Sequence, residues 1–167
     1  EGMANEYMVD LVQDTFHKIP GPEYTEEELA FADALNKQSP MYAQCLASGE
    51  LDNGPMFKGV APISRRSGGG SSDVADVQHI VPCVMVYTAT YNAAGPGHSW
   101  QITACAGHSI GYKGMLLGAK ALAATGMEVA ENMEILEKAK AEFAEKMKGR
   151  EYKCPITPEL PIPQPQK

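Results

Sequence analysis

Histidine side chains are the residues of this chain best suited to chemistry, because a neutral imidazole binds metal ions and titrates near neutral pH. The chain has four, at positions 17, 79, 98 and 108. His17 falls at the end of a predicted helix, and His79 and His108 fall at element boundaries, which favours structural roles. His98 follows Gly95-Pro96-Gly97 just beyond a predicted buried strand, where ligands bind in α/β sheets. His98 is the candidate metal ligand, although spacing alone does not favour that role over a structural one.

A glycine- and serine-rich stretch is the second candidate. Residues 65–73 read Arg-Arg-Ser-Gly-Gly-Gly-Ser-Ser-Asp, and three successive glycines predict a loop. It carries neither the Gly-Lys-Ser/Thr of a phosphate loop nor a dinucleotide fingerprint, which argues against a nucleotide-dependent oxidoreductase. Its backbone N–H groups beside Arg65 and Arg66 could bind a carboxylate or phosphate. A flexible surface loop explains the same residues equally well. Asp73 and Asp76 could cap the next segment or orient a ligand.

No complete metal or nucleophile signature accompanies these residues. The sequence has no His-Glu-x-x-His, no His-x-His, no acidic calcium loop and no Gly-x-Ser-x-Gly. Its cysteines, Cys45, Cys83, Cys105 and Cys154, form no Cys-x-x-Cys pair. We expect buried, reduced thiols of a cytosolic protein.

Apolar periodicity predicts the elements that must position the candidates. Helices are expected over 5–18, from Thr25 to about Pro40, over 107–125 and again from Asn132. Thr25 and Glu28 form a predicted capping box. Small residues in the third helix would let it approach a sheet closely; they are Gly111, Gly114, Gly118 and Ala121.

A continuous apolar run at 80–91 predicts a buried strand from about Val84. Helices alternating with such a strand indicate an α/β fold. One strand cannot form a sheet, so either weak strands lie in 56–66 and 99–104, or the partner strands lie outside this chain.

Composition excludes several classes of protein. The 167 residues (18.0 kDa) are 44% hydrophobic and 21% charged, which suits one globular domain or part of one. A net charge of −7 argues against a nucleic-acid binder. No apolar run approaches the roughly 20 residues of a membrane helix, and no secretory signal is seen, so a cytoplasmic protein is expected. The chain opens Glu-Gly-Met, which predicts either two extra residues before a start or a piece of a longer chain.

Two ordered blocks carry a family resemblance. The first runs from Gly70 to Val77 and includes Ser71, Ser72 and Asp73; the second is 95–101, followed by 110–115. Together they resemble the substrate loop, the late histidine loop and the following helix of the co-catalytic metallopeptidases of the aminoacylase and carboxypeptidase G type. The helix that begins at 24–28 matches too, and the resemblance covers nearly all of the chain.

The resemblance implies both a fold and an activity. It implies an α/β catalytic domain with helices on a mixed sheet, and hydrolysis of N-acyl amino acids such as p-aminobenzoyl-glutamate with two divalent ions, zinc or manganese. By resemblance His98 is a metal ligand, and Gly70, Ser71, Ser72 and Asp73 line the substrate pocket.

The chain departs from the family in one large respect. The other metal ligands and the general base of the family are not recognisable here, and a two-metal site cannot be held by one histidine. Residues 1–152 are therefore expected to be the C-terminal portion of the catalytic domain, without the dimerisation domain, and 153–167 a proline-rich tail. No catalytic residue is assigned. Such a chain would be inactive and would lack metal until its N-terminal half is supplied; homo-oligomerisation is left open.

A different reading of the same departure is a stand-alone, non-catalytic binding module that keeps a remnant of the fold. A folded chain that binds a carboxylate ligand without metal would support that reading.

Overall fold

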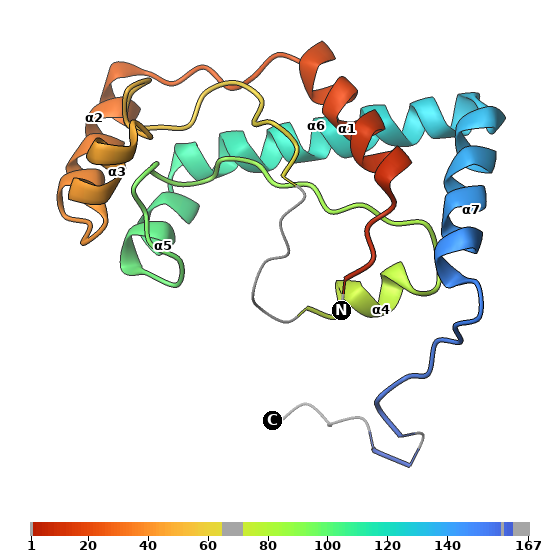
Figure 1. Cartoon of the computed structure of the whole chain (residues 1–167). Coiled ribbons are helices and arrows are strands. Elements are labelled where there is room, and N and C mark those ends of the chain that lie inside the picture. The colour runs from red at the N-terminus through yellow and green to blue at the C-terminus, as the bar shows by residue number, and fades with distance from the viewer. Residues whose placement is uncertain (1, 65–71, 158, 162–167) are drawn as a thin grey trace.

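The computed structural model describes residues 2–64, 72–157 and 159–161, and these form helices joined by extended segments (Figure 1). The helices in chain order are α1 (Glu6–Lys18), α2 (Glu26–Lys37), α3 (Tyr42–Ser48), α4 (Val74–Gln78), α5 (Trp100–Ala106), α6 (Ser109–Glu131) and α7 (Met133–Met147).

The long helix α6 is the axis of the molecule. Helices α1 and α7 pack against it and against each other near its C-terminal end, and α5 packs near its N-terminal end (Figure 1). A hydrophobic core forms where α2 and α5 meet the start of α6, and Met56, from the segment before residue 60, also belongs to it. Its buried members are Ala32, Leu35, Met56, Cys105 and Ile110.

The prediction of an α/β fold with a mixed sheet is wrong for the described residues, which contain no strand. Residues 84–90 run extended across α6 without a ladder partner, and 99–104, one of the suspected weak strands, lies within the cap and body of α5. The other suspected strand, 56–66, is irregular as far as residue 64. The apolar run is not buried on both faces either, since Tyr87 is 78% exposed. A continuous apolar run also fits an extended chain that packs one side on a helix.

Most of the long helices agree with prediction because their signals are local. The capping box is confirmed: Thr25 Oγ1 accepts from Glu28 N (3.2 Å), and Glu28 Oε2 accepts from Thr25 N (2.7 Å). Asn132 caps α7 by accepting from Glu134 N (3.0 Å). Helix α6 continues six residues beyond its predicted end, since nothing in the sequence stops it before Asn132.

The four thiols are free, as expected, but only two are buried. Cys45 and Cys105 are enclosed, Cys83 is half-buried, and Cys154 is exposed in the tail. No helix among the described residues combines the length and the apolarity needed to cross a bilayer.

Candidate functional site

The loop that carries His98 presents its imidazole to solvent. His98 is exposed and adopts a left-handed backbone (φ 56°), between Gly97 and Ser99. Ser99 then caps α5, its Oγ accepting from Ile102 N (3.4 Å). Because the side chain is exposed, the ring nitrogens are accessible to a ligand.

A buried pair of asparagines anchors the start of this loop. Asn36 Oδ1 accepts from Asn92 Nδ2 (2.8 Å) and from Ala94 N (2.8 Å). Asn36 Nδ2 donates to Pro55 O (2.9 Å), which also accepts from Ala93 N (2.9 Å). Both asparagines are at most 1% exposed. The loop that leads to His98 is therefore fixed to the end of α2 by a hydrogen-bonded, buried polar cluster.

Gly95 lies where an added side chain would be crowded. A Cβ there would come within 3.0 Å of Asn92 O, Asn92 Oδ1 and Tyr91 Cδ2. The first glycine of the Gly-Pro-Gly-His run thus avoids crowding against Asn92 and Tyr91.

Two of the four predicted substrate residues are described. Gly70 and Ser71 lie outside the described residues; Ser72 Oγ accepts from Val74 N (3.2 Å), and Asp73 occupies the N-cap position of α4 without a side-chain cap bond. The carboxylate of Asp76 accepts from Tyr152 Oη at 2.9 Å, which docks the residue before the tail on α4.

The structure does not bring Ser72 and Asp73 together with His98. Helix α4 and helix α5, which they adjoin, lie well apart in Figure 1. Within residues 2–64, 72–157 and 159–161 no three His, Cys, Asp or Glu side chains gather as a metal-binding group. One exposed imidazole fits a single ligand position, and the described residues do not fit a complete two-metal site.

The other histidines have structural settings. His17 lies in the last turn of α1, and His79 Nδ1 lies 2.7 Å from Ala75 O. His108 Nδ1 caps α6 by accepting from Ile110 N (3.4 Å), and its ring stacks on Phe31 with centroids 4.4 Å apart.

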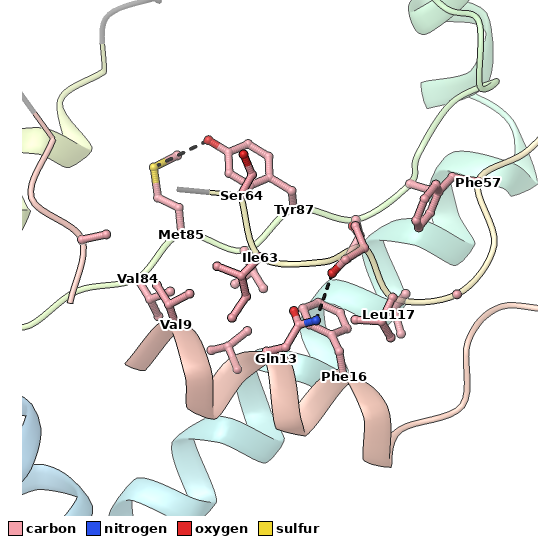
Figure 2. Close-up of a pocket in the computed structure, with 18 of the residues that line it drawn as sticks. Val9, Gln13, Phe16, Phe57, Ile63, Ser64, Val84, Met85, Tyr87 and Leu117 are labelled. Atoms are coloured by element: carbon pink, nitrogen blue, oxygen red, sulfur yellow. Dashed lines mark hydrogen bonds between the residues drawn. The ribbon is translucent and has the colours of Figure 1, made fainter. Parts of the chain in front are cut away.

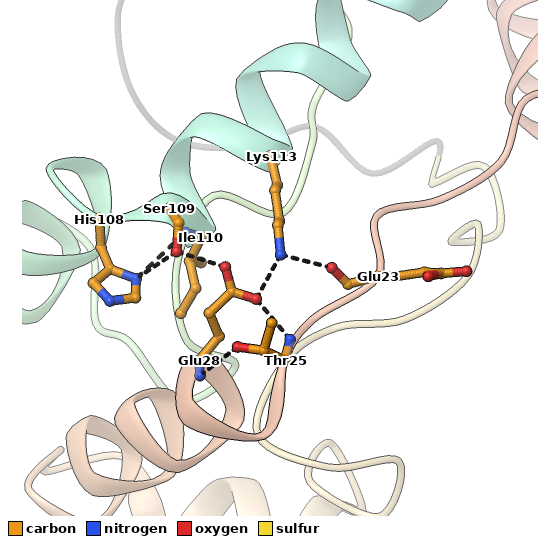
Figure 3. A network of polar contacts seen from close by, with 7 residues as sticks. All are labelled: Glu23, Thr25, Glu28, His108, Ser109, Ile110 and Lys113. Carbon is orange, nitrogen blue, oxygen red and sulfur yellow. Dashed lines mark hydrogen bonds and ion pairs between the residues drawn. The ribbon is translucent and has the colours of Figure 1, made fainter.

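A charged cluster joins α2 to the start of α6 (Figure 3). Glu28 Oε2 accepts from Lys113 Nζ (2.6 Å), and Glu28 Oε1 accepts from Ser109 Oγ (2.5 Å). Glu28 is 5% exposed. Burial raises the pKa of Glu28, but hydrogen bonds from Lys113, Ser109 and the Thr25 N–H outweigh it and lower the pKa to about 2. The carboxylate ties the start of α2 to the first turns of α6, which is a structural role.

Acid is expected to weaken this cluster. Because the pKa of Glu28 in the folded chain (about 2) lies below its ordinary value of 4.5, the unfolded chain takes up the proton first. Stability is then present above pH 4.5 and is lost as the pH falls toward 2. Glu28→Gln should lower the free energy of unfolding at pH 7 by about 2 kcal/mol and flatten the pH dependence in that window, as measured by urea unfolding.

The matched control is Glu134→Gln. Glu134 pairs with Lys138 (2.8 Å) on the exposed side of α7, and an exposed pair of this kind adds little stability because solvent screens it. An equal loss of unfolding free energy in Glu28→Gln and Glu134→Gln would contradict the structural role assigned to Glu28.

Sequence reasoning missed Asn36 and Asn92 as the residues that hold the loop. Asn36 reads as an ordinary polar residue near a helix end, and Asn92 as one of several turn residues. Their pairing spans 56 positions, so no local spacing could reveal it. The Gly-Pro-Gly run was the nearest signal, since a glycine there implies close backbone packing.

Comparison with known proteins identifies a relative along the whole chain. The chain is 30% identical, over 184 aligned positions, to one of the subunits of p-aminobenzoyl-glutamate hydrolase from Escherichia coli strain K12. The alignment covers 99% of this chain and 38% of the relative, so the chain spans well under half of that protein's length. This match confirms the resemblance drawn from the two motif blocks, and the name of the relative describes a subunit of a hydrolase. No protein-family model and no solved structure matches the chain.

Proposed function

We propose that this chain is part of a metal-dependent amidohydrolase that cleaves N-acyl amino acids such as p-aminobenzoyl-glutamate. The observation that carries the proposal is the 30% identity to the E. coli hydrolase along 99% of the chain. Both motif blocks lie within that span.

In this proposal His98 contributes one ligand to a divalent zinc or manganese site. Its support is the exposed imidazole on a loop anchored by Asn36 and Asn92, since a ligand must be accessible and yet fixed in place. The remaining ligands and the general base come from polypeptide that corresponds to the rest of the relative. The chain alone is then inactive.

The glycine-rich loop forms the substrate-binding part of the proposed site. Gly70, Ser71, Ser72 and Asp73 would receive the carboxylate of the acyl amino acid through backbone N–H groups and hydroxyls. Support comes from the order of the loop and the histidine block along the chain, which is that of the resembled family. The enzyme is proposed to act in the cytoplasm, in keeping with its acidic composition and free thiols.

The test is His98→Ala in the complex of this chain with the co-expressed remaining polypeptide of the E. coli relative. Bound metal should fall by about one ion per chain, and hydrolysis of p-aminobenzoyl-glutamate should fall on the order of 100-fold or more. Elemental analysis and an assay for released glutamate measure the two effects. His17→Ala, which removes another exposed histidine, should change neither.

Unchanged metal content in the His98→Ala complex would refute the ligand assignment. If the chain alone bound p-aminobenzoyl-glutamate saturably while the complex neither held metal nor hydrolysed it, the non-catalytic binding module would be the better description.

A further inference from the structure

An apolar groove of about 660 Å³ runs between α1, α6 and the two extended segments 57–64 and 84–89 (Figure 2). Figure 2 shows its walls: side chains of α1 and α6 form the floor, and the extended segments form the sides. The apolar lining includes Val9, Phe16, Phe57, Ile63, Val84 and Leu117.

The rim of this groove exposes large apolar side chains. Tyr87 is 78% exposed, Phe57 48% and Met85 40%. Isolated apolar residues on a surface are ordinary, but a group gathered around one hollow marks a binding surface. Hydrogen bonds tie the extended segments to the two helices, including Gln13 Nε2 to Ala61 O (2.9 Å) and Thr88 Oγ1 to Gly114 O (2.9 Å).

The main chain along both sides of the groove is paired only sparsely: Ala61 O accepts from Gln13 Nε2 (2.9 Å), and Val84 O accepts from Cys83 Sγ (3.9 Å). Within the part of the chain that the structure describes, residues 57–64 and 84–90 make no backbone-to-backbone hydrogen bond. An occupant that covers these groups must offer N–H and C=O groups of its own, or the burial costs free energy. A polypeptide offers both hydrogen-bonding groups and apolar side chains, whereas a lipid chain offers apolar surface alone.

We infer that the groove is the docking surface for the polypeptide that corresponds to the part of the E. coli relative which this chain does not span. The inference rests on the proposed function. Its second support is length: the chain covers 38% of the relative, so more than half of that protein is available to cover the groove.

Along the chain, the sides of the groove lead to both parts of the proposed site. They continue at Ser64 toward the glycine-rich loop and at 89–91 toward the loop of His98.

The test is co-expression of the tagged full chain with the remaining polypeptide of the relative, followed by size-exclusion chromatography. A stable one-to-one complex is expected. Tyr87→Lys should reduce the amount recovered at least tenfold, because it places a charge in the groove rim. Leu46→Lys, which changes an exposed apolar residue on α3 away from the groove, should leave recovery unchanged.

Measurements on Tyr87→Lys without the partner polypeptide distinguish an effect on folding from an effect on binding. Since Tyr87 is largely exposed, Tyr87→Lys alone should keep the circular dichroism spectrum and urea midpoint of the parent. Where the remaining polypeptide is insoluble by itself, its solubilisation by the parent chain and not by Tyr87→Lys is the equivalent readout.

Two results would overturn the inference. One is a complex that tolerates Tyr87→Lys as well as it tolerates Leu46→Lys. The other is self-association of the chain that Tyr87→Lys abolishes, which would make a second copy the occupant. A complex that forms through the groove but does not hydrolyse p-aminobenzoyl-glutamate would refute the proposed function and leave the docking surface standing.

Discussion

Replacing Gly114 by alanine is expected to lower the free energy of unfolding by about 3 kcal/mol, the upper end of the usual cost of overpacking. A Cβ at this position would lie 2.3 Å from Ala89 O and 2.8 Å from Thr90 Cγ2. The first neighbour is backbone, so it cannot turn aside as a flexible side chain would. The extended segment and α6 must separate, which also breaks the bond from Thr88 Oγ1 to Gly114 O (2.9 Å).

Two glycines on the same helix are built-in controls. A Cβ at Gly118 would be 3.6 Å from Thr88 Oγ1, an ordinary contact, and one at Gly126 would meet nothing within 4 Å. Gly126→Ala should raise stability by about 0.8 kcal/mol through helix propensity alone. Urea unfolding of Gly114→Ala, Gly118→Ala and Gly126→Ala measures whether Gly114→Ala is the least stable and Gly126→Ala the most stable of the three. If Gly114→Ala were as stable as Gly118→Ala, the close approach of residues 88–90 to α6 would be refuted.

The small residues of α6 show what a sequence can and cannot predict. Their spacing predicts a helix face that approaches a neighbour closely, and Gly114 does so. The neighbour is an extended segment that pairs with no strand in the described part of the chain, and not a sheet. Helical spacing is a property of one element, whereas strand pairing needs a second segment that local patterns do not identify.

The same distinction holds for the candidate site. The Thr25–Glu28 capping box is predictable because both partners lie within one turn. The partners of Glu28 beyond that turn, Ser109 and Lys113, lie more than 80 positions away, so this ion pair could not be foreseen. His98 is singled out by its glycine-rich loop, and its role as a metal ligand stays a prediction.

Asn36→Ala is expected to cost about 3 kcal/mol and to release the loop that carries His98. The change removes the acceptor for Asn92 Nδ2 and Ala94 N and the donor to Pro55 O, all in a buried cluster. Each buried polar group left without a partner costs about 1–3 kcal/mol. Pro55 O keeps its bond from Ala93 N, so two groups, Asn92 Nδ2 and Ala94 N, lose their partner, and water that enters the space would offset part of the loss.

The control for Asn36 is Gln38→Ala, an exposed amide two positions further along the chain. Gln38 Nε2 donates to Ala34 O (3.2 Å) at the surface, so its loss should cost under about 0.5 kcal/mol. Limited proteolysis measures the second effect: cleavage within 93–99 should accelerate in Asn36→Ala under conditions where the core remains folded. If cleavage there were unchanged while global stability fell by the expected amount, the asparagine pair would stabilise the core without fixing the loop. The accessible imidazole of His98 would then have to be ordered by its ligand, and the proposed metal site would form only on assembly.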